Sequence, residues 1–323
     1  MTTFKEIRGT AVQSVSSDPS NPEVGQLWYN NSIGVLKGYQ SIGGVWASGG
    51  NLSTGRQILG NAGTQTSGLG FGGYISGNVT NVTEEYNGSS WTAGGNMGTA
   101  RRNLGGCGTQ TSALGFGGYI GPLQNATEEY DGSAWTGGGN MGTARMALAG
   151  AGTQTAGLGF GGLGTVDVTN ATEEYDGSSW TSGGNLNTSR WSIAGCGTQT
   201  AGLAFGGSTY APNTPLNATE EYNGSTWTSG GNLGTARRYP AGCGTQTEGL
   251  AFGGTTGSVT GATEEYNGTS WTASTSMATA RAGPGGAGIQ TAGLGFGGTG
   301  FTTATEEYTD PSFAVKTITT STS

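Results

Sequence analysis

The sequence predicts an all-β protein built from repeated four-stranded units. Two observations favour this class. No segment shows the 3.6-residue period of an amphipathic helix over ten residues. A tryptophan also recurs at spacings of 45, 44, 45, 47 and 44 residues, which indicates a repeat of one supersecondary unit. These tryptophans are Trp46, Trp91, Trp135, Trp180, Trp227 and Trp271.

Each repeat keeps a fixed register after its tryptophan. An arginine follows ten residues later, and a phenylalanine with two glycines follows fifteen residues after the arginine. All length variation falls between this Gly-Gly pair and the next Thr-Glu-Glu-Tyr, where 6 to 11 residues intervene. The repeat arginines are Arg56, Arg101, Arg145, Arg190, Arg237 and Arg281.

The strands of one unit can be assigned from its short apolar runs and turn signals. In the third repeat we expect the first strand at Ala147–Gly152, a turn at Thr153–Thr155 and the second strand at Gly157–Gly162. The third strand then begins at Thr172–Tyr175.

A two-residue turn is expected between the third and fourth strands of each unit. Asn87-Gly88 is the pair in the first repeat, and such pairs are typical of the type I′ turn, which needs positive φ at both positions. With this turn, Glu84 is expected to lie opposite Trp91. The same pair recurs as Asp131-Gly132, Asp176-Gly177, Asn223-Gly224 and Asn267-Gly268.

Six units of about 45 residues with four strands each predict a β-propeller, in which small sheets pack radially and bury faces that a single unit leaves open. The order Gly-Gly, Tyr, Trp five residues on, Leu or Met six residues later, and Arg four beyond resembles the kelch repeat. The resemblance covers residues 46 to 308 and implies propeller blades, but no particular function.

Closure of the ring leaves two blade counts open. Tyr308 to Phe313 has the Tyr-to-Trp spacing and would supply the outer strand of the sixth blade. The segment around Trp46 has the features of the same outer strand, so the two segments compete for one position. A seven-blade ring would accommodate both, with a divergent blade from strands within residues 9–15, 26–29, 35–39 and 45–48. Six blades are favoured because the amino-terminal segment has the character of an independent element.

Residues 21–39 resemble a β-hairpin segment found near the start of bacteriophage tail-fibre and related virion proteins. A proline marks the entry, and strands are expected at Leu27–Tyr29 and Val35–Tyr39. The resemblance implies an amino-terminal docking segment (1–45) that contacts other virion proteins, a propeller (46–313) and a carboxy-terminal strand or tail (314–323). It also implies a virion location after synthesis in the host cytoplasm, with several copies in the particle.

Composition excludes several functions. The chain of 323 residues has no histidine, which removes imidazole bases, histidine metal sites and the copper chemistry of the galactose-oxidase-like kelch propellers. The net charge is -8 and no Lys/Arg run exceeds two, which disfavours nucleic acid and anionic membranes as partners. No apolar signal region or 18-residue apolar run is visible. We therefore expect no signal peptide, membrane insertion, metal or cofactor.

The repeated charges are interpreted as structural. We expect the first glutamate of each Glu-Glu pair to accept a charge-assisted hydrogen bond, bidentate in form, from a repeat arginine. The alternatives are catalytic carboxylates or a ring of anion-binding arginines at the channel mouth. The expected pairing glutamates are Glu84, Glu128, Glu173, Glu220, Glu264 and Glu306.

Positions that differ between near-identical repeats are candidates for recognition, because the shared fold does not dictate them. In a propeller the variable loops and the loops after the repeat arginines lie on the same face, and both carry aromatic and basic residues typical of binding surfaces. Neutral surface variation is the alternative. The candidate binding residues are Tyr74, Arg102, Tyr119, Trp191, Tyr210, Arg238 and Tyr239.

The function expected from these observations is that of a non-enzymatic phage virion protein. Its variable face would bind a host surface glycan or protein, or a neighbouring virion protein. Two alternatives stay open: a purely architectural head-decoration or tail-assembly subunit, and an enzyme that acts on polysaccharide through carboxylates at the channel mouth.

Overall fold

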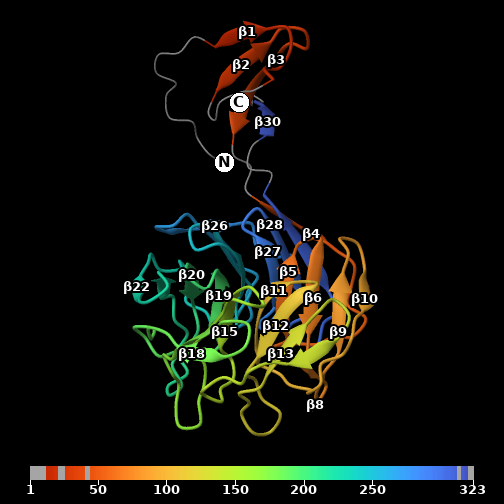
Figure 1. Cartoon of the computed structure of the whole chain (residues 1–323). Helices are drawn as coiled ribbons and strands as arrows, with labels where there is room; N and C mark the ends of the chain where they lie inside the picture. The colour runs from red at the N-terminus through yellow and green to blue at the C-terminus, as the bar shows by residue number, and fades with distance from the viewer. Residues whose placement is uncertain (1–11, 21–25, 41–43, 311–313, 319–323) are drawn as a thin grey trace. The chain divides into compact units, whose positions relative to one another are not determined.

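The computed structural model describes residues 12–20, 26–40, 44–310 and 314–318 (Figure 1). Every regular element in this part of the chain is a β-strand, and none of its segments is a helix long and apolar enough to cross a membrane. The chain divides into two compact units: an N-terminal unit of residues 1–44 and 310–323, and a repeat domain of residues 45–309.

The repeat domain consists of four-stranded antiparallel sheets, one for each repeat, and a two-stranded sheet of β7 (Tyr74–Ile75) and β8 (Asn78–Val79) in the first variable loop. The strands of each four-stranded sheet lie side by side in chain order, except that the sixth sheet takes its fourth strand from the start of the domain. We number these repeat sheets first to sixth. The first contains β5 (Gly60–Thr64), β6 (Ser67–Phe71), β9 (Thr83–Tyr86) and β10 (Trp91–Ala93). The second contains β11 (Gly105–Thr109), β12 (Ser112–Phe116), β13 (Thr127–Tyr130) and β14 (Trp135–Gly137). The third contains β15 (Ala149–Gly152), β16 (Gly157–Phe160), β17 (Thr172–Tyr175) and β18 (Trp180–Ser182). The fourth contains β19 (Ala194–Gly197), β20 (Gly202–Phe205), β21 (Thr219–Tyr222) and β22 (Trp227–Ser229). The fifth contains β23 (Ala241–Gly244), β24 (Gly249–Phe252), β25 (Thr263–Tyr266) and β26 (Trp271–Ser274). The sixth contains β27 (Gly285–Ile289), β28 (Ala292–Phe296), β29 (Thr305–Thr309) and β4 (Val45–Ser48).

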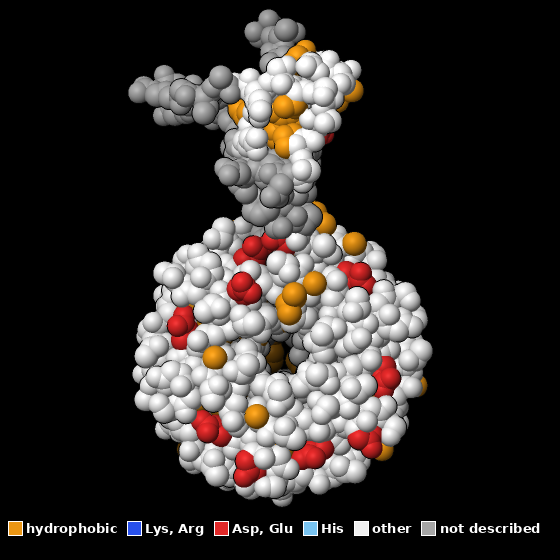
Figure 2. All heavy atoms as spheres, turned by 45° about the horizontal axis from the view of Figure 1, so that its top comes forward, with side chains coloured by type: hydrophobic (Ala, Val, Ile, Leu, Met, Phe, Trp, Pro, Cys, Tyr) orange, Lys and Arg blue, Asp and Glu red, His pale blue; other side chains and the backbone are white. Residues whose placement is uncertain are grey.

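The first strands of the repeat sheets contact one another in the cyclic order β5, β11, β15, β19, β23, β27 and back to β5. Figure 2 shows one face of the repeat domain with an opening at its centre. This repeated arrangement of four-stranded sheets fits a β-propeller, as the repeat predicts.

The core lies between neighbouring repeat sheets. The ring centroid of Phe71 in β6 lies 4.7 Å from that of Trp135 in β14, and the equivalent pair recurs around the domain. A Cβ atom added to Gly115 would lie 2.9 Å from Phe71 Cε2. Glycine at this position therefore allows the second sheet to approach the first closely, which explains part of the glycine content.

The fourth strand of the sixth sheet is β4, so Trp46 occupies the contested outer position. Trp46 lies opposite Tyr308 in the register, and its indole N–H donates a 3.0 Å hydrogen bond to Thr263 Oγ1. A phenylalanine has no such donor. Tyr308 itself lies in the third strand, β29, while Phe313 lies outside the described residues.

The described part of the N-terminal unit forms a separate sheet in the order β1 (Gln13–Val15), β2 (Leu27–Asn30), β3 (Val35–Gln40) and β30 (Ala314–Thr317). The predicted hairpin is confirmed, since β2 and β3 pair in antiparallel fashion. Asp18 Oδ2 lies 2.6 Å from Lys37 Nζ, and Asp18 Oδ1 accepts a 3.1 Å hydrogen bond from the Trp28 indole.

This pairing contradicts the divergent seventh blade. Its proposed last strand, Val45–Ser48, belongs to the sixth repeat sheet, and β3 pairs instead with β30 from the carboxy-terminal segment. Residues 9–11 of the proposed blade lie outside the described residues. The units also divide at 44/45 and 309/310 rather than at 45/46 and 313/314, because β30 joins the amino-terminal strands.

The predicted register between the third and fourth strands is wrong. Tyr86 lies opposite Trp91 and Glu84 opposite Ala93, so four residues rather than two form the loop. The expectation that Glu84 faces Trp91 fails for this reason. The same register recurs in the other repeat sheets.

The loop between the third and fourth strands has four residues because the Asn87 side chain accepts backbone hydrogen bonds within it. Asn87 Oδ1 accepts hydrogen bonds from the backbone N–H groups of Ser89, at 3.0 Å, and Ser90, at 2.9 Å. Of the Asn-Gly pair only Gly88 has positive φ, at 88°. An Asx-type loop therefore forms instead of a type I′ turn.

Candidate functional site

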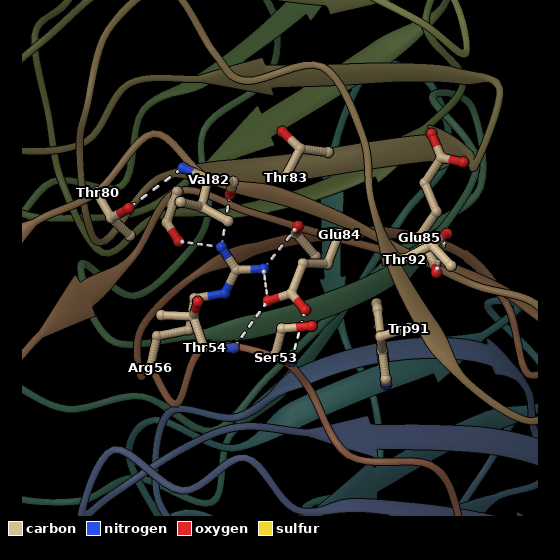
Figure 3. A network of polar contacts seen from close by, with 12 residues as sticks. Ser53, Thr54, Arg56, Thr80, Val82, Thr83, Glu84, Glu85, Trp91 and Thr92 are labelled. Atoms are coloured by element: carbon tan, nitrogen blue, oxygen red, sulfur yellow. Dashed lines mark hydrogen bonds and ion pairs between the residues drawn. The ribbon is translucent and has the colours of Figure 1, made fainter.

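The repeat arginines are buried within the repeat sheets, as Figure 3 shows for Arg56. Arg56 Nη2 lies 3.2 Å from Glu84 Oε1, while Nη1 donates to the carbonyl of Val82 at 2.5 Å. Glu84 Oε2 also accepts the backbone N–H of Ser53 at 2.6 Å. The glutamate therefore holds both the arginine and the loop that carries it.

The structure brings together all of the arginine–glutamate pairs that the sequence suggests. The contact is a single Nη2–Oε1 pair in each case, so the expected bidentate form is wrong. In Arg56 both Nη groups also bind backbone carbonyls, and the Nε atom is buried without a partner. The other pairs are Arg101–Glu128, Arg145–Glu173 and Arg190–Glu220, each at 3.1 Å, Arg237–Glu264 at 2.8 Å, and Arg281–Glu306.

Burial governs the electrostatics of these arginines. Burial lowers the pKa of Arg56 to about 10, and the charge of Glu84 opposes this shift. The guanidinium therefore remains charged at neutral pH. Its side chain has no exposed surface, so it is not accessible to an anion at the channel mouth.

The second glutamate of each pair has a different partner. The Tyr130 hydroxyl donates a 2.5 Å hydrogen bond to Glu85 Oε1, which links the second repeat sheet to the first. The Trp135 indole makes a parallel link to Thr83 Oγ1 at 2.9 Å. Both carboxylates of the Glu-Glu pair thus contact structural partners.

The variable loops and the loops after the repeat arginines meet on one face, which we call the variable face. Each residue directly after a repeat arginine lies beside the residue directly after Gly-Gly of the same repeat. Backbone bridges or hydrogen bonds join Gln57 to Tyr74, Arg102 to Tyr119, Met146 to Leu163, Trp191 to Ser208, Arg238 to Thr255, and Ala282 to Thr299.

The next residue of each arginine loop forms a closed ring of backbone hydrogen bonds. The N–H of each donates to the carbonyl of its equivalent in the preceding repeat, at 2.7 to 2.9 Å, and Ile58 closes the ring by donating to Gly283. All have positive φ, which is unfavourable for the β-branched Ile58, at 51°. The ring residues are Ile58, Asn103, Ala147, Ser192, Tyr239 and Gly283.

A cavity of about 100 Å³ lies at this ring and is lined by residues from every repeat. We call it the mouth cavity. Tyr239 lines it, whereas no aspartate or glutamate does. This cavity therefore contains none of the carboxylates that the enzyme alternative places at a channel mouth.

Two clusters contain all of the predicted binding residues except Arg238. In the first, Arg102 Cζ lies 4.5 Å from the ring centroid of Tyr74 and 5.4 Å from that of Tyr119. In the second, the Trp191 ring lies 6.0 Å from both the Tyr210 and the Tyr239 ring centroids.

Arg238 has no ring contact among the described residues, but its charge acts on the neighbouring Tyr239. Burial raises the pKa of Tyr239, and this shift is opposed by the Ser192 hydroxyl and by the charges of Arg238 and Arg102. Both arginines therefore act electrostatically on Tyr239, which lines the mouth cavity.

Of the residues in the hydrogen-bonded backbone ring, only Tyr239 was among the predicted binding residues. The signal was present: residue two after the repeat arginine is a different amino acid in every repeat, within a frame that is otherwise nearly constant. Phe301 was also missed. Its ring lies 5.8 Å from that of Tyr74 and extends the first cluster.

The three cysteines lie on first strands of the repeat sheets and line a second cavity. Cys107, Cys196 and Cys243 are free and buried, and burial raises the pKa of Cys107 and Cys196 to about 12. Since the thiolate is the reactive form, these thiols act as small apolar residues. The described residues contain no group of three His, Cys, Asp or Glu side chains placed to hold a metal.

The chain matches no protein-family model and no curated protein.

Proposed function

We propose that the chain is a closed, six-bladed, kelch-type propeller that serves as a non-enzymatic recognition component of a bacteriophage particle. The variable face binds a host surface glycan or protein, or a neighbouring virion protein. The N-terminal unit attaches the propeller to the particle, for example to a tail fibre, through other virion proteins.

The closed ring is supported by contacts between the first and sixth repeat sheets. The Gln65 amide donates to the carbonyl of Tyr308 at 2.6 Å, just as Gln110 donates to that of Tyr86 at 2.7 Å between the first and second sheets. The pairing of β4 with β29 adds a strand from the domain's start to its last sheet. Such closure protects the edges of the last sheet.

One observation carries the recognition role: a constant scaffold presents varied side chains on one face. Every repeat retains its arginine–glutamate pair and its place in the hydrogen-bonded ring. The residues one and two positions after the arginine nevertheless change in size, charge and polarity between repeats. A rigid frame with varied, partly exposed aromatic and basic residues is typical of binding surfaces.

The virion role rests on the resemblance of residues 21–39 to the hairpin segment of tail-fibre proteins. The described part of this segment is a β2–β3 hairpin in a unit separate from the repeat domain. A small independent sheet is suitable for docking without disturbing the propeller. In a particle, several copies would then present the variable face together and increase avidity.

Binding to bacterial cells tests the recognition role. Fluorescently labelled full chain is expected to bind susceptible cells, and Trp191→Ala is expected to reduce this binding. Thr228→Ala, an exposed position on a fourth strand, serves as the control. Equal loss in both variants, or binding that resists Trp191→Ala, contradicts the proposal.

Imaging of purified particles tests the virion role. The protein is expected at a defined position in stoichiometric amount, and absence from the particles contradicts this part. A protein that is present in particles but binds no cells would have the purely architectural role. Release of reducing sugar from capsule or cell wall by the purified chain would instead establish an enzyme.

A further inference from the structure

The repeat domain leaves two of its arginines without an acidic partner. Of the eight arginines in residues 45–309, all of which the structure describes, the six repeat arginines form buried ion pairs. Among the described residues, neither of the others, Arg102 and Arg238, has an ion-pair partner or a side-chain hydrogen-bond partner. Both directly follow a repeat arginine and therefore lie on the variable face.

These two arginines come from opposite sides of the ring. Arg102 belongs to the second repeat and Arg238 to the fifth, which are three steps apart in the cyclic order of first strands. The charges of both act on Tyr239, which lines the mouth cavity. Both charges therefore act on a residue of the cavity wall.

Acidic side chains are scarce on the variable face, where the two unpaired arginines lie. Asp167 is the only acidic residue in the variable loops and the arginine loops, and it does not line the mouth cavity. In contrast, the face of the repeat domain in Figure 2 shows aspartate and glutamate side chains and no lysine or arginine. In a chain with a net charge of -8, the repeat domain thus has its two unpaired arginines on the variable face.

The aromatic residues add a second requirement for the ligand. Arg102 lies against the rings of Tyr74 and Tyr119, which orders its guanidinium, and its Nε atom is buried without a partner. Trp191, Tyr210 and Tyr239 form an aromatic surface beside the cavity, and such surfaces stack on the apolar faces of sugar rings.

We propose that the variable face binds an acidic saccharide of several residues, with the carboxylate of one sugar residue at Arg102 and the ring of another against Trp191 and Tyr239. Arg238 and the Tyr239 hydroxyl add positive potential and a hydrogen-bond donor. The planar guanidinium matches the two oxygens of a carboxylate. This inference rests on the proposed recognition function and names the ligand class of the same face.

The test is direct binding of defined probes to the full chain, measured by calorimetry and tryptophan fluorescence. The probes are trigalacturonate, its methyl ester, the neutral galactose trimer, sialyllactose, lactose and inorganic phosphate. At least one carboxylated probe is expected to bind about tenfold or more tightly than its neutral counterpart, because hydrogen bonds to charged groups are the stronger ones. Added salt is expected to weaken this binding.

Variants locate the site on the face. Arg102→Ala and Arg238→Ala are each expected to weaken binding of the acidic probe about tenfold. The sixth repeat has Ala282 at the equivalent position, so alanine there is compatible with the fold. Met146→Ala, at the same position of the third repeat, is the matched control and is expected to retain affinity.

Three outcomes overturn the inference: no carboxylated probe binds at millimolar concentration, the neutral counterparts bind equally well, or the arginine variants retain full affinity. Phosphate that binds as tightly as the acidic saccharides also overturns it, since the site would then select an anion without a sugar. If cells still bind in a Trp191-dependent way, only the ligand class is wrong. If cell binding is absent as well, the recognition function itself fails.

Discussion

The Tyr86 hydroxyl donates a hydrogen bond of 2.5 Å to Glu307 Oε1 and thereby joins the first repeat sheet to the sixth, across 221 residues of sequence. The same tyrosine–glutamate bond links each repeat sheet to the one before it. The other pairs are Tyr130–Glu85, Tyr175–Glu129, Tyr222–Glu174, Tyr266–Glu221 and Tyr308–Glu265.

Removal of the tyrosine hydroxyl should lower the stability equally between the first and sixth sheets and between two sheets that are consecutive in the chain. Tyr86→Phe and Tyr175→Phe are each expected to lower the free energy of unfolding by about 1 to 3 kcal/mol, because each leaves a carboxylate oxygen without its donor. Urea denaturation followed by tryptophan fluorescence measures both. A negligible effect of Tyr86→Phe beside a clear effect of Tyr175→Phe would mean that the first and sixth sheets separate in solution.

The tyrosines that link neighbouring repeat sheets should make the repeat domain sensitive to alkaline pH. Burial, and then the hydrogen bond to a glutamate, raises the pKa of Tyr86, Tyr130, Tyr175, Tyr222 and Tyr266 from 10.0 to about 12. The folded state therefore holds protons that the unfolded state loses, so stability is complete below pH 10 and falls as pH rises toward 12.

Thermal melts between pH 8 and 12 test this dependence. The melting temperature is expected to be flat up to about pH 10, the ordinary tyrosine pKa, and to fall above it. Tyr175→Phe should be less stable at pH 8 and should lose less on going to pH 12. An identical slope in the variant and the parent would show that other groups control alkaline unfolding.

The buried ion pairs should be costly to break from one side. Arg145→Met leaves Glu173 buried without its cation, which is expected to cost about 3 to 5 kcal/mol of unfolding free energy. The double variant Arg145→Met with Glu173→Gln should recover part of this loss, because the uncompensated charge is gone. Arg102→Met, on the variable face, is the control and should cost less than about 1 kcal/mol. Equal costs for Arg145→Met and Arg102→Met would contradict the structural role.

Strand β4 should be required for the repeat domain, whereas the residues before it should not. A chain of residues 45–309 is expected to fold cooperatively, since it retains all four strands of the sixth sheet. A chain of residues 49–309 loses β4 and exposes the edge of β29, so it should melt at lower temperature or self-associate. Calorimetry and light scattering compare the two, and equal stability would show that another segment completes the sixth sheet.

Much of the repeat domain was predictable because its copies are nearly identical. Equivalent residues must occupy equivalent environments, so the recurrence of Arg56 and Glu84 with constant partners in sequence indicated a structural pair. The variable face was predictable for the same reason, since Arg102, Trp191 and Arg238 depart from a constant frame. The ring position of Ser192 was overlooked, although its variation is equally visible.

The sequence alone determined the all-β class, the repeat register and the residues that each repeat contributes, because periodicity and turn residues are local properties of the chain. Only the tertiary structure decided that Trp46 rather than the carboxy-terminal segment completes the sixth sheet, and that Tyr86 meets Glu307. It also decided the strand register, where the Asn87 side chain enlarges the loop to four residues. These choices depend on competing partners for the same donors and strand edges, and no local pattern records which partner is nearer in space.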